Sequence, residues 1–274
     1  MRKALFTLLV AASLSVAAAS TYSTDVSDLW WNPDESGWGV NLIQQGDTLF
    51  ATFFIYGADG RPRWLVAPDM KGDGAPTDHP LTFRGRLFET TAPVVTGAPF
   101  NPAAVVRRDV GDVIFQFFRP FRGDIHYTVD GVTVGKQIRR QTWTATDITG
   151  EFNANRVLRP HLCNGPNTGR EPVTNDALGT MTVAQSGSAV QITTHPAIAG
   201  ALACTFTGTR SQEGRMSAVD GTYACSDGTS GPFSLTEIEV SKWGFMGRIT
   251  TTVRGCGMHG TFGGARATVE ELPS

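Results

Sequence analysis

The stretch DLWWNPDESGWGVNLIQQGDTLFATFFIY, from Asp28 to Tyr56, decides the fold of the chain. Trp38, Val40 and Leu42 alternate with Gly39, Asn41 and Ile43, which is close to the two-residue period of a β-strand. Gly46-Asp47 then supplies a turn, and residues 49–56 read as a second strand rich in aromatic side chains. The stretch therefore predicts a β-hairpin, and Asp59-Gly60 directly after it predicts the next tight turn.

The same pattern continues along the chain. Short apolar or alternating runs, broken by Gly, Pro, Asn and Asp, recur about every ten residues, and helical periodicity is almost absent after residue 19. About eight such runs precede residue 147, joined mostly by hairpins, which is typical of a small up-and-down barrel or a strongly curved sheet. Residues 146–172 are poor in apolar side chains, and the strand pattern then restarts.

These observations predict an all-β protein of two antiparallel β-domains, over residues 20–147 and 148–274. The hydrophobic content of 41% is sufficient for packed cores. We find no clear internal repeat between the two halves, and a doubled fold with diverged sequence stays open.

The first nineteen residues have the features of a secretory signal peptide. Arg2 and Lys3 are followed by the apolar run Leu5–Val16 and by the small residues Ala17–Ala19. The apolar run is shorter than the roughly 20 residues of a transmembrane helix. We predict cleavage near Ser20, a secreted or periplasmic location, and no membrane insertion after cleavage.

The charge of the chain is nearly balanced, with a formal net charge of −2 at pH 7 over 274 residues. Neither half carries the basic patch that nucleic acid requires, so we expect no nucleic-acid partner. We expect the mature chain to be a monomer.

The four cysteines, all in the second half, predict disulfide bonds, since an even number is typical of exported domains. Three pairings are open, and spacing favours Cys163 with Cys204 and Cys225 with Cys256. No C-x-x-C pair is present to bind zinc, and the calcium pattern D-x-[DN]-x-[DN]-G is not matched. We therefore predict no metal site and no cofactor.

Catalytic patterns are weak in this sequence. Asp34 and Glu35 are adjacent, which does not place two carboxylates face to face across a cleft. The histidines are scattered, and no G-x-S-x-G motif occurs. We therefore assign no catalytic residue, although a hydrolase with a site assembled from dispersed residues such as Glu35, Asp112 and His126 stays an alternative.

The tryptophans have two roles in the prediction. Trp38 lies in the first strand that the pattern predicts, so we expect it to close one end of the barrel, with Arg139 or Arg140 from the last strand over its ring. Lipocalin-like folds use a similar pairing, but Gly37-Trp38-Gly39 is only close to their pattern, and no site follows from the likeness.

Four other aromatic residues are the predicted ligand anchors: Trp30, Trp31, Tyr56 and Trp64. They suggest a non-enzymatic binding module for an apolar, glycan or protein ligand. The alternative from another class is a cell-surface assembly or adhesion module, in which aromatic strands pair with another chain.

Residues 29–66 resemble a segment of exported proteins of Gram-negative bacteria that share the opening W-W-N-P-x-E-S-G-W-G and a D-G-x-P-x-W hairpin. Here these motifs stand at Trp30–Gly39 and Asp59–Trp64. The stretch GTYACSDGTSGPFSLTEIEVSKWGFMGRI, Gly221–Ile249, is similar to such proteins as well. The resemblance implies export and a β-domain and carries no assigned activity.

Overall fold

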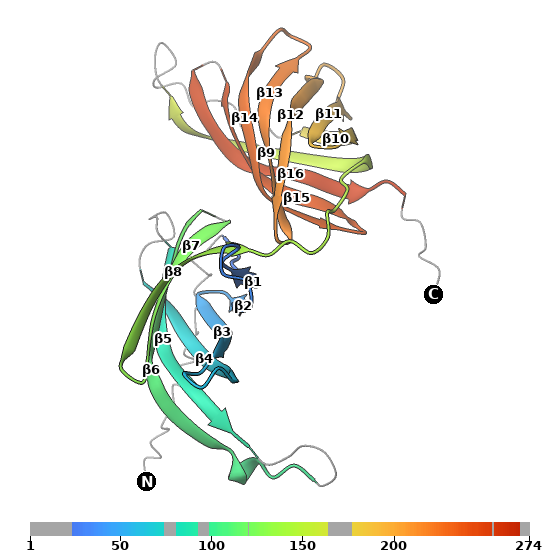
Figure 1. Cartoon of the computed structure of the whole chain (residues 1–274). Coiled ribbons are helices and arrows are strands. Elements are labelled where there is room, and N and C mark those ends of the chain that lie inside the picture. The colour runs from blue at the N-terminus through green and yellow to red at the C-terminus, as the bar shows by residue number, and fades with distance from the viewer. Residues whose placement is uncertain are drawn as a thin grey trace, which may run out of the picture.

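The computed structural model describes residues 24–73, 81–92, 99–119, 121–163, 177–253 and 255–268, and the predicted signal peptide lies outside these ranges. The described residues form two closed barrels, each of eight antiparallel strands, joined by a single connection (Figure 1). The prediction of an all-β chain with two antiparallel β-domains is therefore confirmed.

Both barrels have an up-and-down order, in which each strand pairs with its neighbours in sequence and the first strand pairs with the last. The first barrel consists of β1 (Asp28–Trp31), β2 (Gly39–Gln45), β3 (Thr48–Tyr56), β4 (Pro62–Asp73), β5 (Leu81–Thr91), β6 (Val106–Arg119), β7 (Arg122–Val129) and β8 (Val132–Arg140), with a 3₁₀ turn, η1, at Pro102–Ala104. The second consists of β9 (Gly150–Cys163), β10 (Ala177–Ser186), β11 (Ala189–Pro196), β12 (Cys204–Glu213), β13 (Met216–Cys225), β14 (Ser230–Ser241), β15 (Gly244–Val253) and β16 (Cys256–Arg266).

Strand β3 shows why the sequence forms a barrel wall. Leu49, Ala51 and Phe53 are buried, whereas Phe50 and Phe54 on the opposite face are exposed. This alternation follows from the two-residue period of a strand, so one face of β3 enters the core and the other faces solvent. The aromatic content alone did not reveal which rings would be outside.

A column of aromatic rings fills the first barrel. Trp30 lies 4.9 Å from Phe117 between ring centroids, Phe117 stacks on Phe115 at 5.9 Å, Phe115 lies 6.0 Å from Phe53, and Phe53 lies 5.6 Å from Tyr127. Close-packed interiors of this kind hold the surrounding strands rigidly. The first barrel is therefore packed with side chains along this column.

One end of the first barrel is closed by Trp30 and Arg140. The two residues are Cα partners across β1 and β8, and the guanidinium carbon of Arg140 lies 4.9 Å from the centroid of the fully buried Trp30 ring. Arg140 also donates hydrogen bonds to the carbonyl oxygens of Asp25 and Ser27 and to the carboxylate of Asp28. These contacts compensate the buried charge and seal the barrel.

This arrangement corrects the role expected of Trp38. The first strand is β1, Asp28–Trp31, which the sequence pattern missed, so Trp30 and not Trp38 meets the last strand. Trp38 precedes β2 and is only partly buried against the core, with its Nε1 donating to Glu35 at 3.1 Å.

The second barrel has an equivalent pair at its seam, which is longer, with eleven paired positions between β9 and β16. Phe152 on β9 and Arg266 on β16 are Cα partners, and the guanidinium carbon lies 5.0 Å from the ring centroid. Arg266 donates to the carbonyl oxygen of Thr149, as Arg140 does to Ser27. We call each aromatic–arginine pair, with the short segment before it, a closing motif.

The two closing motifs also share an equivalent backbone hydrogen bond. The backbone N–H of buried Val26 donates to the side-chain oxygen of Gln44, and that of buried Ile148 donates to Gln185. The segments TDVS, residues 24–27, and TDIT, residues 146–149, therefore occupy equivalent places. The two halves are therefore structural repeats of each other. The sequence did not show this repeat clearly.

The two closed ends meet through the hairpin between β12 and β13. Glu213 accepts from Arg139 at 2.7 Å, and the backbone N–H of Arg215 donates to Asp28 at 3.0 Å. The connection between the barrels runs over residues 141–149, which include Asp147, the position at which the sequence placed the domain boundary.

The second barrel contains a disulfide bond between Cys204 and Cys225, which are Cα partners on β12 and β13. Cys256 is disulfide-bonded as well, and the register places Cys163 opposite it on β9. The pairing that spacing favoured, Cys163 with Cys204 and Cys225 with Cys256, was therefore wrong, because adjacent strands decide which sulfurs can meet. A disulfide is typical of a compartment outside the cytoplasm.

The closing motif can be tested by truncating its ring. Trp30→Ala should lower the free energy of unfolding of the first barrel by about 3 to 5 kcal/mol, because it leaves a cavity and uncovers Arg140. The same change at Trp64, whose side chain is 55% exposed, should cost less than about 1 kcal/mol. Urea unfolding followed by circular dichroism measures both. Equal losses in the two variants would contradict the assigned role of Trp30.

Candidate functional site

The end of the first barrel opposite the closing motif carries a groove. The described parts of this end are the turn between β3 and β4, the turn between β7 and β8, the loop between β1 and β2, and η1 between β5 and β6. We call it the open end. Two groups of side chains meet there, one on the outer face of the sheet and one around the mouth.

The first group is a set of exposed aromatic rings on β3 and β4. Phe54, Tyr56 and Trp64 are 51%, 56% and 55% exposed, and Phe54 and Trp64 are Cα partners. Side chains at such partner positions stand side by side on one face of the sheet. In the described part of the chain, none of these three rings contacts another aromatic ring. We call the three residues the aromatic face.

Further apolar side chains stand on the same outer wall, separated from the aromatic face on one side by the polar pair Asn41 and Thr52. Ile43 and Phe50 are exposed Cα partners further along β2 and β3, and Trp31 at the end of β1 is partly exposed. Gly37 adjoins the Tyr56 ring, since a Cβ atom there would lie 3.8 Å from the Tyr56 hydroxyl oxygen. Exposed apolar side chains gathered on one wall mark interaction sites more often than isolated ones do.

The four predicted anchors differ in how far their side chains are exposed. Tyr56 and Trp64 are exposed and Trp31 is partly so, whereas Trp30 is fully buried in the closing motif and has no surface for a ligand. The anchor role predicted for Trp30 therefore does not hold. Phe54 was not among the predicted anchors. The strand period could have indicated it, because the successive residues Phe53 and Phe54 must face opposite sides of the sheet.

The second group surrounds a groove of about 520 Å³ at the mouth. Its lining contains three arginines and three carboxylates, so its formal charges cancel. The residues that line the groove are Gly57, Ala58, Asp59, Arg61, Pro62, Arg63, Glu89, Arg108 and Asp130.

Four of these residues form a closed ring of ion pairs. Arg63 contacts Glu89 at 2.7 Å and Asp130 at 2.9 Å, and Arg108 contacts the same two carboxylates at 2.6 and 2.5 Å. The ring joins β4, β5, β6 and the turn after β7, where Asp130 has a φ of 51° and Gly131 a φ of 83°. Asp-Gly in this left-handed conformation is the expected two-residue hairpin turn. We call the four side chains the ion-pair ring.

The ion-pair ring keeps its carboxylates ionised. Hydrogen bonds from Arg108 and then Arg63 lower the pKa of Asp130 to about 2. Hydrogen bonds from Arg63 and then Arg108 lower the pKa of Glu89. A general acid at neutral pH needs a raised pKa, so these groups are suited to accept hydrogen bonds and not to give protons to a substrate.

The residues of the hydrolase alternative do not form one cluster. Glu35 pairs with Lys136 at 2.7 Å, and this hydrogen bond is the main reason why the pKa of Glu35 is lowered. Lys136 is the Cα partner of buried Ile125, on the inner side of the sheet. Asp112 and His126 are exposed on β6 and β7, on the outer side.

The described residues hold no group of three or more His, Cys, Asp or Glu side chains placed to bind a metal ion. In the same ranges, no helix has the length and hydropathy of a membrane span.

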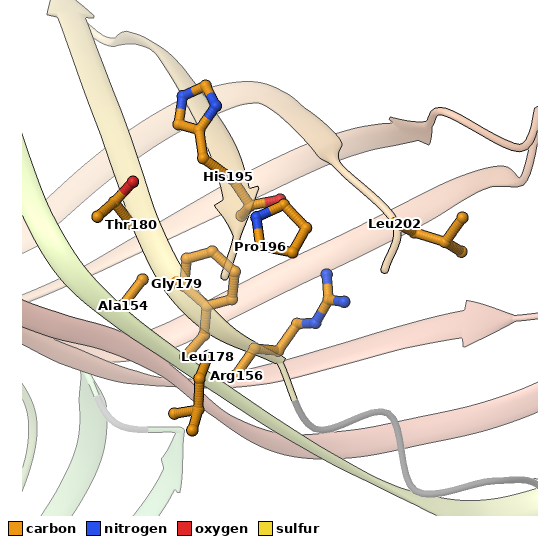
Figure 2. Close-up of a pocket in the computed structure, with 10 residues that line it drawn as sticks. Ala154, Arg156, Leu178, Gly179, Thr180, His195, Pro196 and Leu202 are labelled. Atoms are coloured by element: carbon orange, nitrogen blue, oxygen red, sulfur yellow. The ribbon is translucent and has the colours of Figure 1, made fainter. Parts of the chain in front are cut away.

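The second barrel has a recess of a different kind at its corresponding end. Buried Arg156 points toward the gap between Pro196 and Leu202, while the imidazole of His195 points away (Figure 2). The recess has a volume of about 20 Å³, which is room for about one water molecule.

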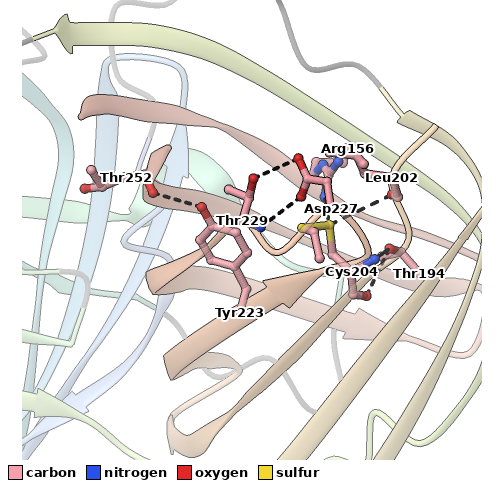
Figure 3. The surroundings of a disulfide bond; sticks show 9 residues. Arg156, Thr194, Leu202, Cys204, Tyr223, Asp227, Thr229 and Thr252 are labelled. Carbon is pink, nitrogen blue, oxygen red and sulfur yellow. Dashed lines mark hydrogen bonds between the residues drawn. A yellow bond between two sulfur atoms is a disulfide. The ribbon is translucent and has the colours of Figure 1, made fainter. Parts of the chain in front are cut away.

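The disulfide lies beside this recess. Figure 3 shows Arg156 next to Cys204, with 3.8 Å between Nη1 and Sγ. Burial lowers the pKa of Arg156. Thr194 holds the Cys204 backbone by two hydrogen bonds, of 2.9 and 3.1 Å. This end is tightly packed, so the first barrel offers the larger site.

Comparison with known proteins gives no relative of this chain: no family model, no curated protein and no solved structure matches it.

The ion-pair ring predicts a specific pH response. Because the pKa of Asp130 is about 2 in the folded chain and about 4 in an unfolded one, its stabilising effect is complete above about pH 4 and is lost as the pH falls toward 2. Arg108→Gln should raise the pKa of Asp130 toward the unfolded value. Carbon-13 NMR titration of the Asp130 carboxyl measures this.

The control is Arg61→Gln, since Arg61 contacts Asp59 and not Asp130. This change should leave the titration of Asp130 as it is in the unmodified protein. A titration of Asp130 that Arg108→Gln does not alter would show that the ring does not form in solution.

Proposed function

We propose that this protein is a secreted or periplasmic binding module without turnover, and that the aromatic face of its first barrel holds the ligand. One observation carries the proposal: Phe54, Tyr56 and Trp64 are each more than half exposed and lie together on one wall of a barrel packed with side chains. Rings that are not needed inside a core are available to a partner outside it.

The position of these rings favours binding energetically. A large aromatic side chain covers roughly 150 to 250 Å², and Tyr and Trp are enriched at interfaces because they combine apolar area with a polar group. They stand on paired strands, so their backbone positions are fixed before a ligand arrives. Little order remains to be imposed on binding, which leaves more of the contact energy as affinity.

Because the interior of the first barrel is packed with side chains, we place the ligand on the outer surface. The column of rings from Trp30 to Tyr127 occupies the first barrel along its length. A hollow barrel would bind a ligand internally, as small barrels with cavities do. In this chain, the outer face and the open end are the surfaces that support a ligand.

Two features support export. The signal-like pattern at residues 1–19 predicts secretion, and the disulfide between Cys204 and Cys225 is typical of an oxidising compartment. A secreted or periplasmic location agrees with both. A binding module in such a compartment meets extracellular polymers, envelope components and other exported proteins.

The test removes two rings of the aromatic face. The double variant Tyr56→Ala/Trp64→Ala should bind at least about tenfold more weakly than the unmodified protein to 8-anilinonaphthalene-1-sulfonate and to any positive member of a glycan array, because it loses its main contact area. Its melting temperature should change little, since both side chains are exposed. Fluorescence titration and array intensity measure binding.

The matched control is Trp243→Ala, a tryptophan of the second barrel that is 60% exposed. It should bind as the unmodified protein does. Equal binding by the double variant and the unmodified protein, or no binding of any probe by the unmodified protein, would refute the proposal.

A further inference from the structure

We infer that the ligand is a neutral oligosaccharide, which stacks on the aromatic face and reaches over the turn between β3 and β4 to hydrogen-bond with the ion-pair ring. This inference rests on the proposed function and adds the chemical class of the ligand. Three properties of the open end support it: the continuity of the two surfaces, the cancelled charge of the groove, and the mixture of stacking and polar groups.

The aromatic face and the groove meet at the turn between β3 and β4. Tyr56 is the Cα partner of Pro62, and both Pro62 and Gly57 line the groove. The turn is held by a hydrogen bond from the Gly57 N–H to the Arg61 carbonyl oxygen at 2.9 Å. A chain-like ligand can therefore lie on the outer rings and continue into the groove across a fixed edge.

The charge of the groove argues against an ionic ligand. Each arginine in its lining has a carboxylate partner: Arg61 pairs with Asp59, and Arg63 and Arg108 share Glu89 and Asp130. An anion would have to displace a carboxylate, and a cation would have to displace a guanidinium. A neutral ligand needs neither exchange.

The ion-pair ring still has hydrogen-bonding capacity for such a ligand. A guanidinium has five N–H donors, and Arg63 uses its Nε and Nη2 groups in the ring. Carboxylate oxygens accept more than one hydrogen bond each. Hydroxyl groups both donate and accept, so a polyhydroxyl ligand can use both kinds of group at once.

Stacking supplies the other half of carbohydrate recognition. The C–H faces of sugar rings are apolar and pack against flat aromatic rings, and Trp64 and Tyr56 offer such rings. A purely apolar ligand would gain nothing from the charged groove and would have to desolvate it. The groove volume of about 520 Å³ lies within the range of small-ligand sites.

The experiment uses the mature chain and isothermal titration calorimetry with neutral hexasaccharides of glucose, xylose, mannose and N-acetylglucosamine. An acidic oligogalacturonate serves as the charged comparison. We expect at least one neutral hexasaccharide to bind and the acidic one to bind more weakly. Arg108→Gln and Tyr56→Ala/Trp64→Ala should each weaken the binding about tenfold or more, since each removes one half of the contacts.

The matched control is Arg86→Gln. The Arg86 side chain is 59% exposed, against 50% for Arg108, and it pairs with Asp109, but it does not line the groove. It should bind the sugar as the unmodified protein does, and thermal unfolding of every variant reports whether the fold is kept.

The outcomes separate the two proposals. Sugar binding that Arg108→Gln does not weaken, or tighter binding of the acidic sugar, overturns the inference and leaves the aromatic face as a binding surface. Binding of 8-anilinonaphthalene-1-sulfonate, whose naphthalene and phenyl rings bind apolar surface, without binding of any neutral hexasaccharide has the same meaning. No binding of dye or sugar by the unmodified protein overturns both proposals.

Discussion

The first barrel depends on an arginine that covers an aromatic ring where its first and last strands meet, and the second barrel has an equivalent pair at its longer seam. In the first barrel this seam is short, because β1 has four residues and pairs with β8 at Trp30 and Trp31. So few backbone pairs leave the seam weak unless side chains reinforce it. Arg140 does so by binding Trp30 on one side and two carbonyl oxygens and a carboxylate on the other. Removing either partner would leave a buried charge or a cavity, so the pair acts as a unit.

Because each barrel carries the closing motif at one end only, the two ends of each barrel differ. One end carries the closing motif and the contacts between barrels, and its residues are constrained by them. The other end is free to differ: the first barrel has the ion-pair ring there, and the second has the disulfide between Cys204 and Cys225 next to a small recess. Sites built on a rigid scaffold are typically placed where the scaffold does not need its own residues. The location of the candidate site follows from this division.

Much of the fold could be predicted from local patterns, since strand alternation and turn residues act within about ten positions of each other. The number of strands in the first barrel follows from such patterns, and Tyr56 and Trp64, two of the predicted anchors, are exposed. The predictions that were wrong concern partners far apart in sequence. The ring that meets the last strand is Trp30 and not Trp38, and the favoured cysteine pairing was wrong. The repeat was not clear from the sequence because the two halves share few similar residues. TDVS in the first half corresponds to TDIT in the second, and Trp30 corresponds to Phe152. The ion-pair ring joins residues from 63 to 130, and nothing in the sequence brings them together.

The ion-pair ring contributes to stability and also holds polar groups in place. A single exposed ion pair contributes typically less than about 1 kcal/mol, because water competes with each partner and ordering the side chains costs entropy, whereas a network with bidentate arginine–carboxylate contacts contributes more. The Arg63 and Glu89 side chains of this network are only 21% and 25% exposed. The barrel below it is already held by the aromatic column. Yet the ring ties four separate elements into one arrangement, in which two carboxylates stay ionised beside two fixed guanidiniums. Polar groups held in place in this way need no reorganisation when a ligand arrives. Their position next to exposed Tyr56 and Trp64 supports the proposal that the ring serves a ligand in addition to joining these four elements.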